Sequence, residues 1–124
     1  MAYYIKYGDF ELHIETEFFT SYPVNTYVNI KINSNTFSAI TTMETSNERF
    51  ESFADDLAKM YSLLNGKAEL SEIYGLGQFI RFTYINNGHI LFEGMLEVFD
   101  GSAGDRVRIK FEKTIDQSCL ANLR

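Results

Sequence analysis

The sequence predicts an α+β fold in which mostly antiparallel sheet packs against one long helix. Apolar and polar residues alternate with a period of two in two separate runs, which is typical of strands with one buried face. Between these runs, at about residues 45–65, apolar residues recur every three or four positions, as in an amphipathic helix. Aromatic residues make up 15% of the chain and proline occurs once, which favours sheet over a helical bundle. We therefore expect one globular domain, residues 1–124, with the order strands, helix, strands and a short C-terminal helix.

The first run of strands contains the clearest alternation in the chain. At residues 10–18 the even positions are large apolar residues or threonine, which predicts one buried face. The preceding residues are expected to pair with this strand across a Gly8–Asp9 turn. Residues 24–32 alternate again, and a strand at 36–43 is expected after an Asn33–Ser34–Asn35 turn. The outer face of the 10–18 strand is acidic and carries Glu11, His13, Glu15 and Glu17.

The central helix has recognisable signals at both ends. Thr45 followed by Glu48 matches a capping box and predicts the N-terminal end. Asn65–Gly66 predicts the C-terminal end, because glycine adopts the left-handed conformation without strain. The apolar face of this helix is expected to consist of Phe50, Phe53, Leu57, Met60, Tyr61 and Leu64.

The second run of strands allows a register to be predicted. Residues 78–85 and 89–99 flank an Asn86–Asn87–Gly88 loop. With Gly88 left-handed in a three-residue loop, Phe82 lies opposite Phe92 and the apolar side chains of both strands share one face. The sheet partners on that face are expected to be Ile80 with Gly94, Phe82 with Phe92, and Tyr84 with Ile90.

The last predicted strand, residues 105–113, places cations on its outer face. Glu93 and Glu97 of the preceding strand have matching parity, so cross-strand ion pairs are expected. Residues 114–123 are expected to form a short helix. The cations on the outer face of the 105–113 strand are Arg106, Arg108 and Lys110.

Composition restricts the classes of partner. Eleven Lys and Arg against seventeen Asp and Glu give a net charge of −6, and an acidic surface repels nucleic-acid phosphates and anionic lipids. No apolar run approaches the roughly 18 residues of a membrane span, and the N-terminal residues do not resemble a secretion signal. The single cysteine, Cys119, has no disulfide partner within the chain. These observations predict a cytoplasmic protein that contacts neither nucleic acid nor membrane directly.

No catalytic, cofactor or metal site is predicted. His13 lies between Glu11 and Glu15 at a spacing that a metal could bridge, but a solvated strand face is the favoured interpretation. His89 has no nucleophile in a strand–turn–helix elbow, so a hydrolase is a weak alternative. Gly75–Leu76–Gly77 precedes a strand and not a helix, so it lacks the helix N-terminus that holds a phosphate. We therefore expect a protein that is not an enzyme.

Two acidic groups are candidate partner-binding surfaces. Five of the seventeen acidic residues lie between positions 44 and 56. The helix dipole favours acidic residues in the first turn, but Glu51 and Asp55 repel each other at four residues apart. This group is therefore either a solvated helix face or a docking face for a basic partner. The candidate contacts are Glu44, Glu48, Glu51, Asp55 and Asp56 in this group, and Glu11, Glu15 and Glu17 on the strand face.

Several motifs from the helix onward form a longer pattern. They are F-x-x-x-L at 53–57, L-x-G-x-A-x-L at 64–70, G-x-I-x-x-x-G-x-L at 88–96, and Phe111 followed by D-Q-S-x-L at 116–120. The pattern covers roughly residues 45–123 and resembles the WapI-like family of small bacterial immunity proteins. Its most particular part is the Asp116–Gln117–Ser118 signature.

The resemblance implies a cytoplasmic bacterial protein that binds and blocks the toxin domain of a polymorphic secreted toxin, with no catalytic residues of its own. A basic nuclease is one toxin class that an acidic inhibitor fits. Asp116 and Gln117 have two interpretations, a cap for the C-terminal segment or a partner contact. Two other functions stay open: a binding site for a small apolar ligand within an aromatic-rich sheet, and self-association as a homodimer through an exposed edge strand.

Overall fold

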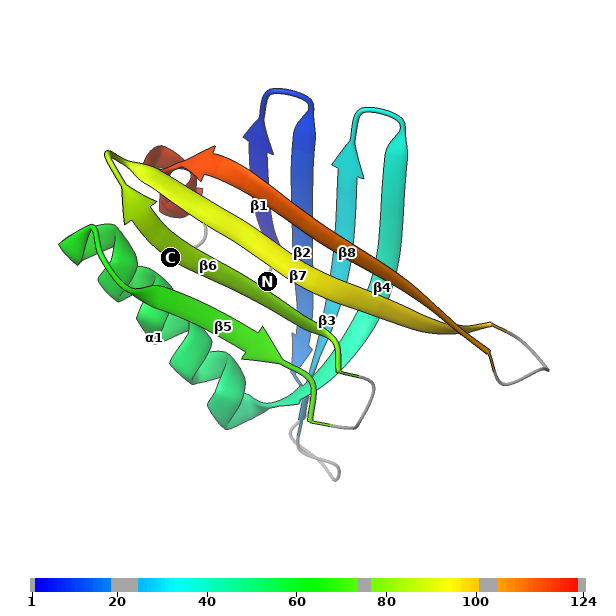
Figure 1. Ribbon diagram of the computed structural model, residues 1–124. Coiled ribbons are helices and arrows are strands. Elements are labelled where there is room, and N and C mark those ends of the chain that lie inside the picture. Colours follow the sequence, from blue (N-terminus) through cyan, green and yellow to red (C-terminus); the bar gives the residue numbers. More distant parts are fainter. Residues whose placement is uncertain (1, 19–24, 74–76, 101–104, 123–124) are drawn as a thin grey trace.

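The computed structural model of the protein describes residues 2–18, 25–73, 77–100 and 105–122, which form two four-stranded antiparallel sheets, one α-helix and a terminal 3-10 helix (Figure 1). Sheet A has the order β1 (Ala2–Tyr7), β2 (Phe10–Phe18), β3 (Asn25–Ser34) and β4 (Phe37–Ser46). Sheet B has the order β5 (Lys67–Ser71), β6 (Phe79–Asn86), β7 (His89–Asp100) and β8 (Asp105–Asp116). Helix α1 (Asn47–Leu63) connects the sheets, and η2 (Gln117–Asn122) follows β8. The predicted α+β class and element order are confirmed.

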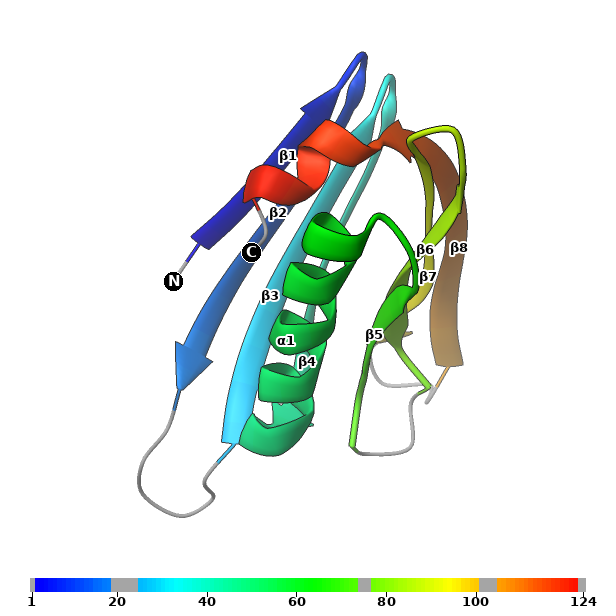
Figure 2. The ribbon, with the colours of Figure 1, turned by 90° about the vertical axis from the view of Figure 1, so that its left-hand side faces the viewer.

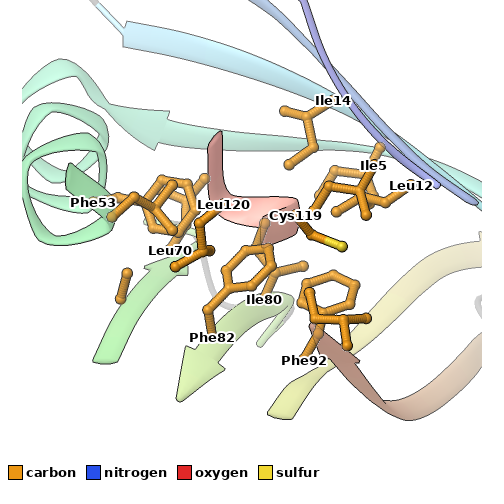
Figure 3. Close-up of a cluster of buried hydrophobic side chains, with 14 of the residues drawn as sticks. Ile5, Leu12, Ile14, Phe53, Leu70, Ile80, Phe82, Phe92, Cys119 and Leu120 are labelled. Carbon is orange, nitrogen blue, oxygen red and sulfur yellow. The ribbon is translucent and has the colours of Figure 1, made fainter. Parts of the chain in front are cut away.

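The two sheets face each other, and α1 closes the space between them on one side. Figure 2 shows α1 between sheet A and β5, with η2 lying across the top of the same opening. The core combines the inner faces of both sheets with one face of the helix. Phe82 and Phe92 of sheet B stack with ring centroids 4.4 Å apart (Figure 3), while Phe10 of sheet A contacts Phe92 and Phe53 of α1 contacts Phe82. A chain of aromatic contacts therefore connects all three parts of the fold.

Sheet A follows the predicted alternation, with one turn displaced. The Gly8–Asp9 hairpin is confirmed, because Tyr7 pairs with Phe10. The second turn is Asn35–Thr36 and not 33–35, because β3 continues to Ser34. Asn35 takes the left-handed conformation that this tight turn needs, with φ at 58°, and asparagine tolerates that conformation better than most residues.

The predicted N-terminal cap of α1 is wrong by one residue. The cap is Ser46, whose Oγ accepts a hydrogen bond of 3.1 Å from the N–H of Arg49. Thr45 is still part of β4, and its hydroxyl donates to the carbonyl oxygen of Ser71 at 2.9 Å. The Thr45–Glu48 capping box therefore does not form, because a contact with a distant strand occupies the threonine.

The C-terminal end of α1 also precedes the predicted position. The helix ends at Leu63, and Leu64 adopts the left-handed cap conformation with its N–H bonded to the carbonyl oxygen of Met60 at 2.9 Å. Gly66 has a φ of 96°, so it supplies a later turn toward β5 and not the cap itself. Leu64 is consequently exposed, whereas four of the predicted face residues, Phe50, Phe53, Leu57 and Met60, are buried as expected.

The predicted register of sheet B is confirmed. Ile80 pairs with Gly94, Phe82 with Phe92 and Tyr84 with Ile90. The connecting turn has two residues, Asn87 and Gly88, and a bulge at residue 85 absorbs the extra residue of the predicted three-residue loop. Most of the Gly75–Gly77 loop lies outside the described residues. Strand β8 extends to residue 116, so the terminal helix starts three residues later than predicted and is a 3-10 helix.

A buried glutamine, Gln78, connects the two sheets. Its Oε1 accepts hydrogen bonds from the hydroxyl of Thr41 at 3.0 Å and from the N–H of Glu97 at 3.1 Å. Its Nε2 donates to a Glu72 carboxylate oxygen at 2.8 Å and to the carbonyl oxygen of Thr42 at 3.3 Å. One side chain thus ties β4 of sheet A to β7 of sheet B.

Replacing Gln78 by methionine, which has a similar volume, is expected to lower the free energy of unfolding by about 2–4 kcal/mol. The substitution leaves the buried hydroxyl of Thr41 and the amide of Glu97 without this partner, and each such loss costs about 1–3 kcal/mol. Urea unfolding followed by circular dichroism measures the change, with the exposed Asn86→Met as control. A loss below about 1 kcal/mol contradicts this role of Gln78.

Candidate functional site

The predicted acidic face of β2 lies on the outer surface of sheet A. Glu15 and Glu17 are exposed and Glu11 is half-buried, because Leu12, Ile14 and their even-numbered neighbours fill the core side of the strand. The pairing of β2 between β1 and β3 fixes the position of these carboxylates on a sheet surface. The structure therefore places all three strand candidates on one exposed face.

Glu44, predicted to lie just ahead of the helix cap, belongs to this same face. It lies directly opposite Tyr27 of β3, which in turn lies opposite Glu17 of β2. One carboxylate oxygen of Glu44 accepts a hydrogen bond of 2.7 Å from the side-chain amide of Asn25. The structure thus divides the group predicted at 44–56 and moves one member to sheet A. We call the resulting set the acidic sheet face: Glu11, Glu15, Glu17 and Glu44.

Aromatic side chains lie among these carboxylates. The ring of His13 contacts Tyr4 with centroids 4.6 Å apart, and its Nε2 lies 3.6 Å from a Glu11 oxygen. A shallow hollow of about 400 Å³ opens here, and its lining includes Tyr4, His13, Glu15, Lys31 and Ile40. Within the described part of the chain, no three His, Cys, Asp or Glu side chains are arranged to hold a metal ion.

The remaining helix candidates form a separate surface on α1. Glu48, Glu51 and Asp55 are exposed and Asp56 is half-buried, on the side of the helix away from its buried apolar residues. Glu48 lies in the first turn, where the helix dipole favours a carboxylate. We call Glu48, Glu51, Asp55 and Asp56 the acidic helix face.

The outer face of sheet B is mixed in charge and partly paired within itself. Arg81 contacts Glu69 and Glu93, each at 2.9 Å, and these two hydrogen-bonded carboxylates raise the pKa of Arg81. The predicted cross-strand pairs form at Glu97 alone, which lies 3.5 Å from Arg106 and 3.3 Å from Arg108. The side chain of Glu97 is 0% exposed, so this carboxylate is covered and not on an open surface.

The Asp116–Gln117–Ser118 signature holds the C-terminal 3-10 helix in place. The Asp116 carboxylate accepts hydrogen bonds from the hydroxyl and the N–H of Ser118, and these bonds lower the pKa of Asp116. The N–H of Gln117 donates to the carbonyl oxygen of Gly88 at 2.8 Å, which fixes η2 to the β6–β7 turn. Cys119 is buried, and burial raises the pKa of its thiol. The geometry therefore supports the capping interpretation of this signature.

No helix among the described residues has the length and apolar character that crossing a membrane requires. The fold and these surfaces define a small two-sheet α+β protein whose outer faces carry extended charged groups. Its sequence matches the immunity protein WapI-like family over residues 5–124, nearly the whole chain. The chain therefore belongs to the WapI-like family of immunity proteins, and the match includes residues 5–44, which the motif pattern did not cover. Comparison with curated proteins and with solved structures gives no match.

Proposed function

We propose that this protein neutralises a secreted toxin by binding its toxin domain in the bacterial cytoplasm. Membership of the immunity family carries the proposal. Inhibition by binding requires a complementary surface and no reacting groups.

The acidic sheet face is our proposed contact surface. It combines four carboxylates from β2 and β4 with two cations of the same face, Lys6 of β1 and Lys31 of β3. Tyr4 and Tyr27 lie among the carboxylates, and aromatic residues of this kind supply much of the affinity at protein interfaces. A sheet also presents its side chains in fixed positions, which lowers the entropy lost on binding.

The acidic helix face is the second candidate surface. Its first-turn carboxylate, Glu48, has a local structural role at the helix N-terminus, so its presence needs no partner. Glu51 and Asp55 are not explained in this way, since they lie four residues apart on an exposed helix and repel each other. We therefore keep this surface as the matched comparison in the experiments below.

The chemistry of the acidic sheet face favours a basic partner. A toxin that cleaves nucleic acid needs cations where its substrate binds, and carboxylates on a rigid sheet occupy such a surface as phosphates do. A basic nuclease domain is therefore the toxin class that we propose.

Growth rescue tests the proposed function. The C-terminal domain of the protein encoded immediately upstream is expressed in a host cell with and without this chain. We expect the domain alone to stop growth and co-expression to restore it. A chain with His89→Ala is expected to rescue as well as the wild type, because no catalytic step is involved. Continued growth arrest at equal expression of both proteins contradicts the proposal.

A further inference from the structure

A second surface, between the two sheets, has the properties of a binding groove. It lies opposite the side that α1 closes, where β4 and β8 are the free edges of sheets A and B. The groove has a volume of about 410 Å³. Phe10 and Ile32 are buried at its floor, whereas Phe37 is 81% exposed and Ile109 is 43% exposed. We call it the β4–β8 groove, and its apolar lining consists of Phe10, Ile32, Phe37, Ala39, Ile109 and Phe111.

The apolar surface continues beyond the groove. Figure 1 shows the far ends of β7 and β8 projecting past β4. Val98 and Val107 form a cross-strand pair on the face that holds Ile109, and both are exposed. A strip of exposed apolar side chains therefore leads along β8 into the groove. Such a continuous strip on a small charged protein is typical of a protein-binding site.

The groove also carries unmatched positive charge. Lys113 belongs to its lining and lies on the face of β8 that holds Ile109 and Phe111, and within the described residues no carboxylate lies at ion-pair distance from it. Lys113 is half-buried, and its ammonium lies 5.9 Å from the ring centre of Tyr7. On a chain with a net charge of −6, such a cation beside an apolar groove is complementary to a carboxylate of a partner.

Strand β8 offers backbone hydrogen bonds on its free edge. Among the described strands it pairs with β7 alone, so one side of its backbone has no strand partner. Extended peptides bind such edges by adding a strand, with side-chain pockets giving specificity. A second copy of this chain is disfavoured, because residues 106–110 of β8 carry three cations and no acidic residue, so pairing this stretch with its twin opposes like charges.

From these observations we infer that an extended segment of the toxin binds in the β4–β8 groove and pairs with the free edge of β8. The segment places an apolar side chain against Phe37 and Phe111, and a carboxylate beside Lys113. This inference rests on the proposed function, since it names the part of the toxin that one surface takes. It divides the interface into two roles: the acidic sheet face speeds association, and the groove slows dissociation.

Binding kinetics of the purified toxin domain test the inference. The chain with Phe37→Ser and Ile109→Thr is expected to dissociate roughly tenfold faster or more, with an association rate within about twofold of wild type. Leu63→Ser is the matched control, because Leu63 is 72% exposed on α1 and far from the groove in sequence and fold. Circular dichroism checks that all variants are folded.

Two further measurements test the positive charge of the groove and the free edge of β8 separately. Lys113→Glu is expected to speed dissociation, and Lys59→Glu on α1, which changes the net charge equally, is not. Hydrogen exchange is expected to slow in the amides of β8 when the toxin domain binds, because the added strand bonds its free edge.

The outcomes distinguish the two proposals. Toxin binding that is unaffected by the groove variants, without protection of β8, overturns the inference and leaves the proposed function standing. Failure of the wild-type chain to bind the toxin domain overturns both. A concentration-dependent dimer that Phe37→Ser disrupts assigns the groove to a second copy of the chain and overturns the inference. Saturable binding of an apolar fluorescent probe, with no effect of the variants on toxin binding, assigns the groove to a small ligand and also overturns it.

Discussion

Replacing Phe82 by alanine is expected to lower the free energy of unfolding by about 3–5 kcal/mol. Phe82 is 0% exposed, and its ring stacks on Phe92 at 4.4 Å and lies 6.3 Å from that of Phe53. The substitution removes the ring at which α1 and sheet B meet. Because β6 and β7 are hydrogen-bonded to strands on both sides, they cannot collapse fully into the space that is left. A loss of this size is a large part of the stability of a typical domain.

Urea unfolding measures the effect of Phe82→Ala. The matched control is Phe37→Ala, the same change at a phenylalanine that is mostly exposed, for which we expect a change below about 0.5 kcal/mol. The comparison separates the loss of a buried ring from any intrinsic effect of alanine in a strand. Equal changes in the two variants would mean that Phe82 is not at the centre of the core.

Reversing three charges of the acidic sheet face is expected to reduce the rate of toxin association by about 10- to 100-fold at low salt. The variant carries Glu15→Lys, Glu17→Lys and Glu44→Lys. Its association rate is also expected to depend less on salt, because the long-range attraction to a basic partner is removed. Stopped-flow or surface-based kinetics at several ionic strengths measure both effects.

The acidic helix face provides a control with the same change in net charge. The control variant carries Glu48→Lys, Glu51→Lys and Asp55→Lys, and we expect its association rate to fall less than that of the acidic sheet face variant. Equal losses in both variants would show that overall charge controls association and that neither surface is specific. A larger loss in the helix variant would move the contact surface to α1.

Local patterns were sufficient to predict most strands and one register. The alternation at residues 10–18 predicted which side chains are buried, and Gly88 with its neighbours predicted that Phe82 faces Phe92. Both depend on residues close together in the chain. The cap at Thr45 was predicted wrongly because its hydroxyl bonds to Ser71, which is 26 residues away. Leu64 ends the helix in the left-handed conformation, which cannot be predicted from its residue type.

The candidate surfaces were also predicted only as far as they depend on residues close together in the chain. The exposure of Glu11, Glu15 and Glu17 followed from strand parity, but the place of Glu44 depends on the β3–β4 register. A shift of one residue in that register moves every side chain of β4 to the other face of the sheet. With the β3–β4 turn predicted at the wrong residues, the sequence could not group Glu44 with the carboxylates of β2. The β4–β8 groove depends on how two whole sheets pack together, and no local pattern in the sequence contains that information.

The central claim is that this chain neutralises its toxin by direct binding. Titration calorimetry of the purified chain with the purified toxin domain tests it most directly, because it requires no cell and no other component. We predict a saturable one-to-one complex whose affinity weakens as salt rises and weakens further in the acidic sheet face variant. Absence of binding at micromolar concentrations, with both proteins folded and the toxin domain active, would contradict the claim even if co-expression restored growth.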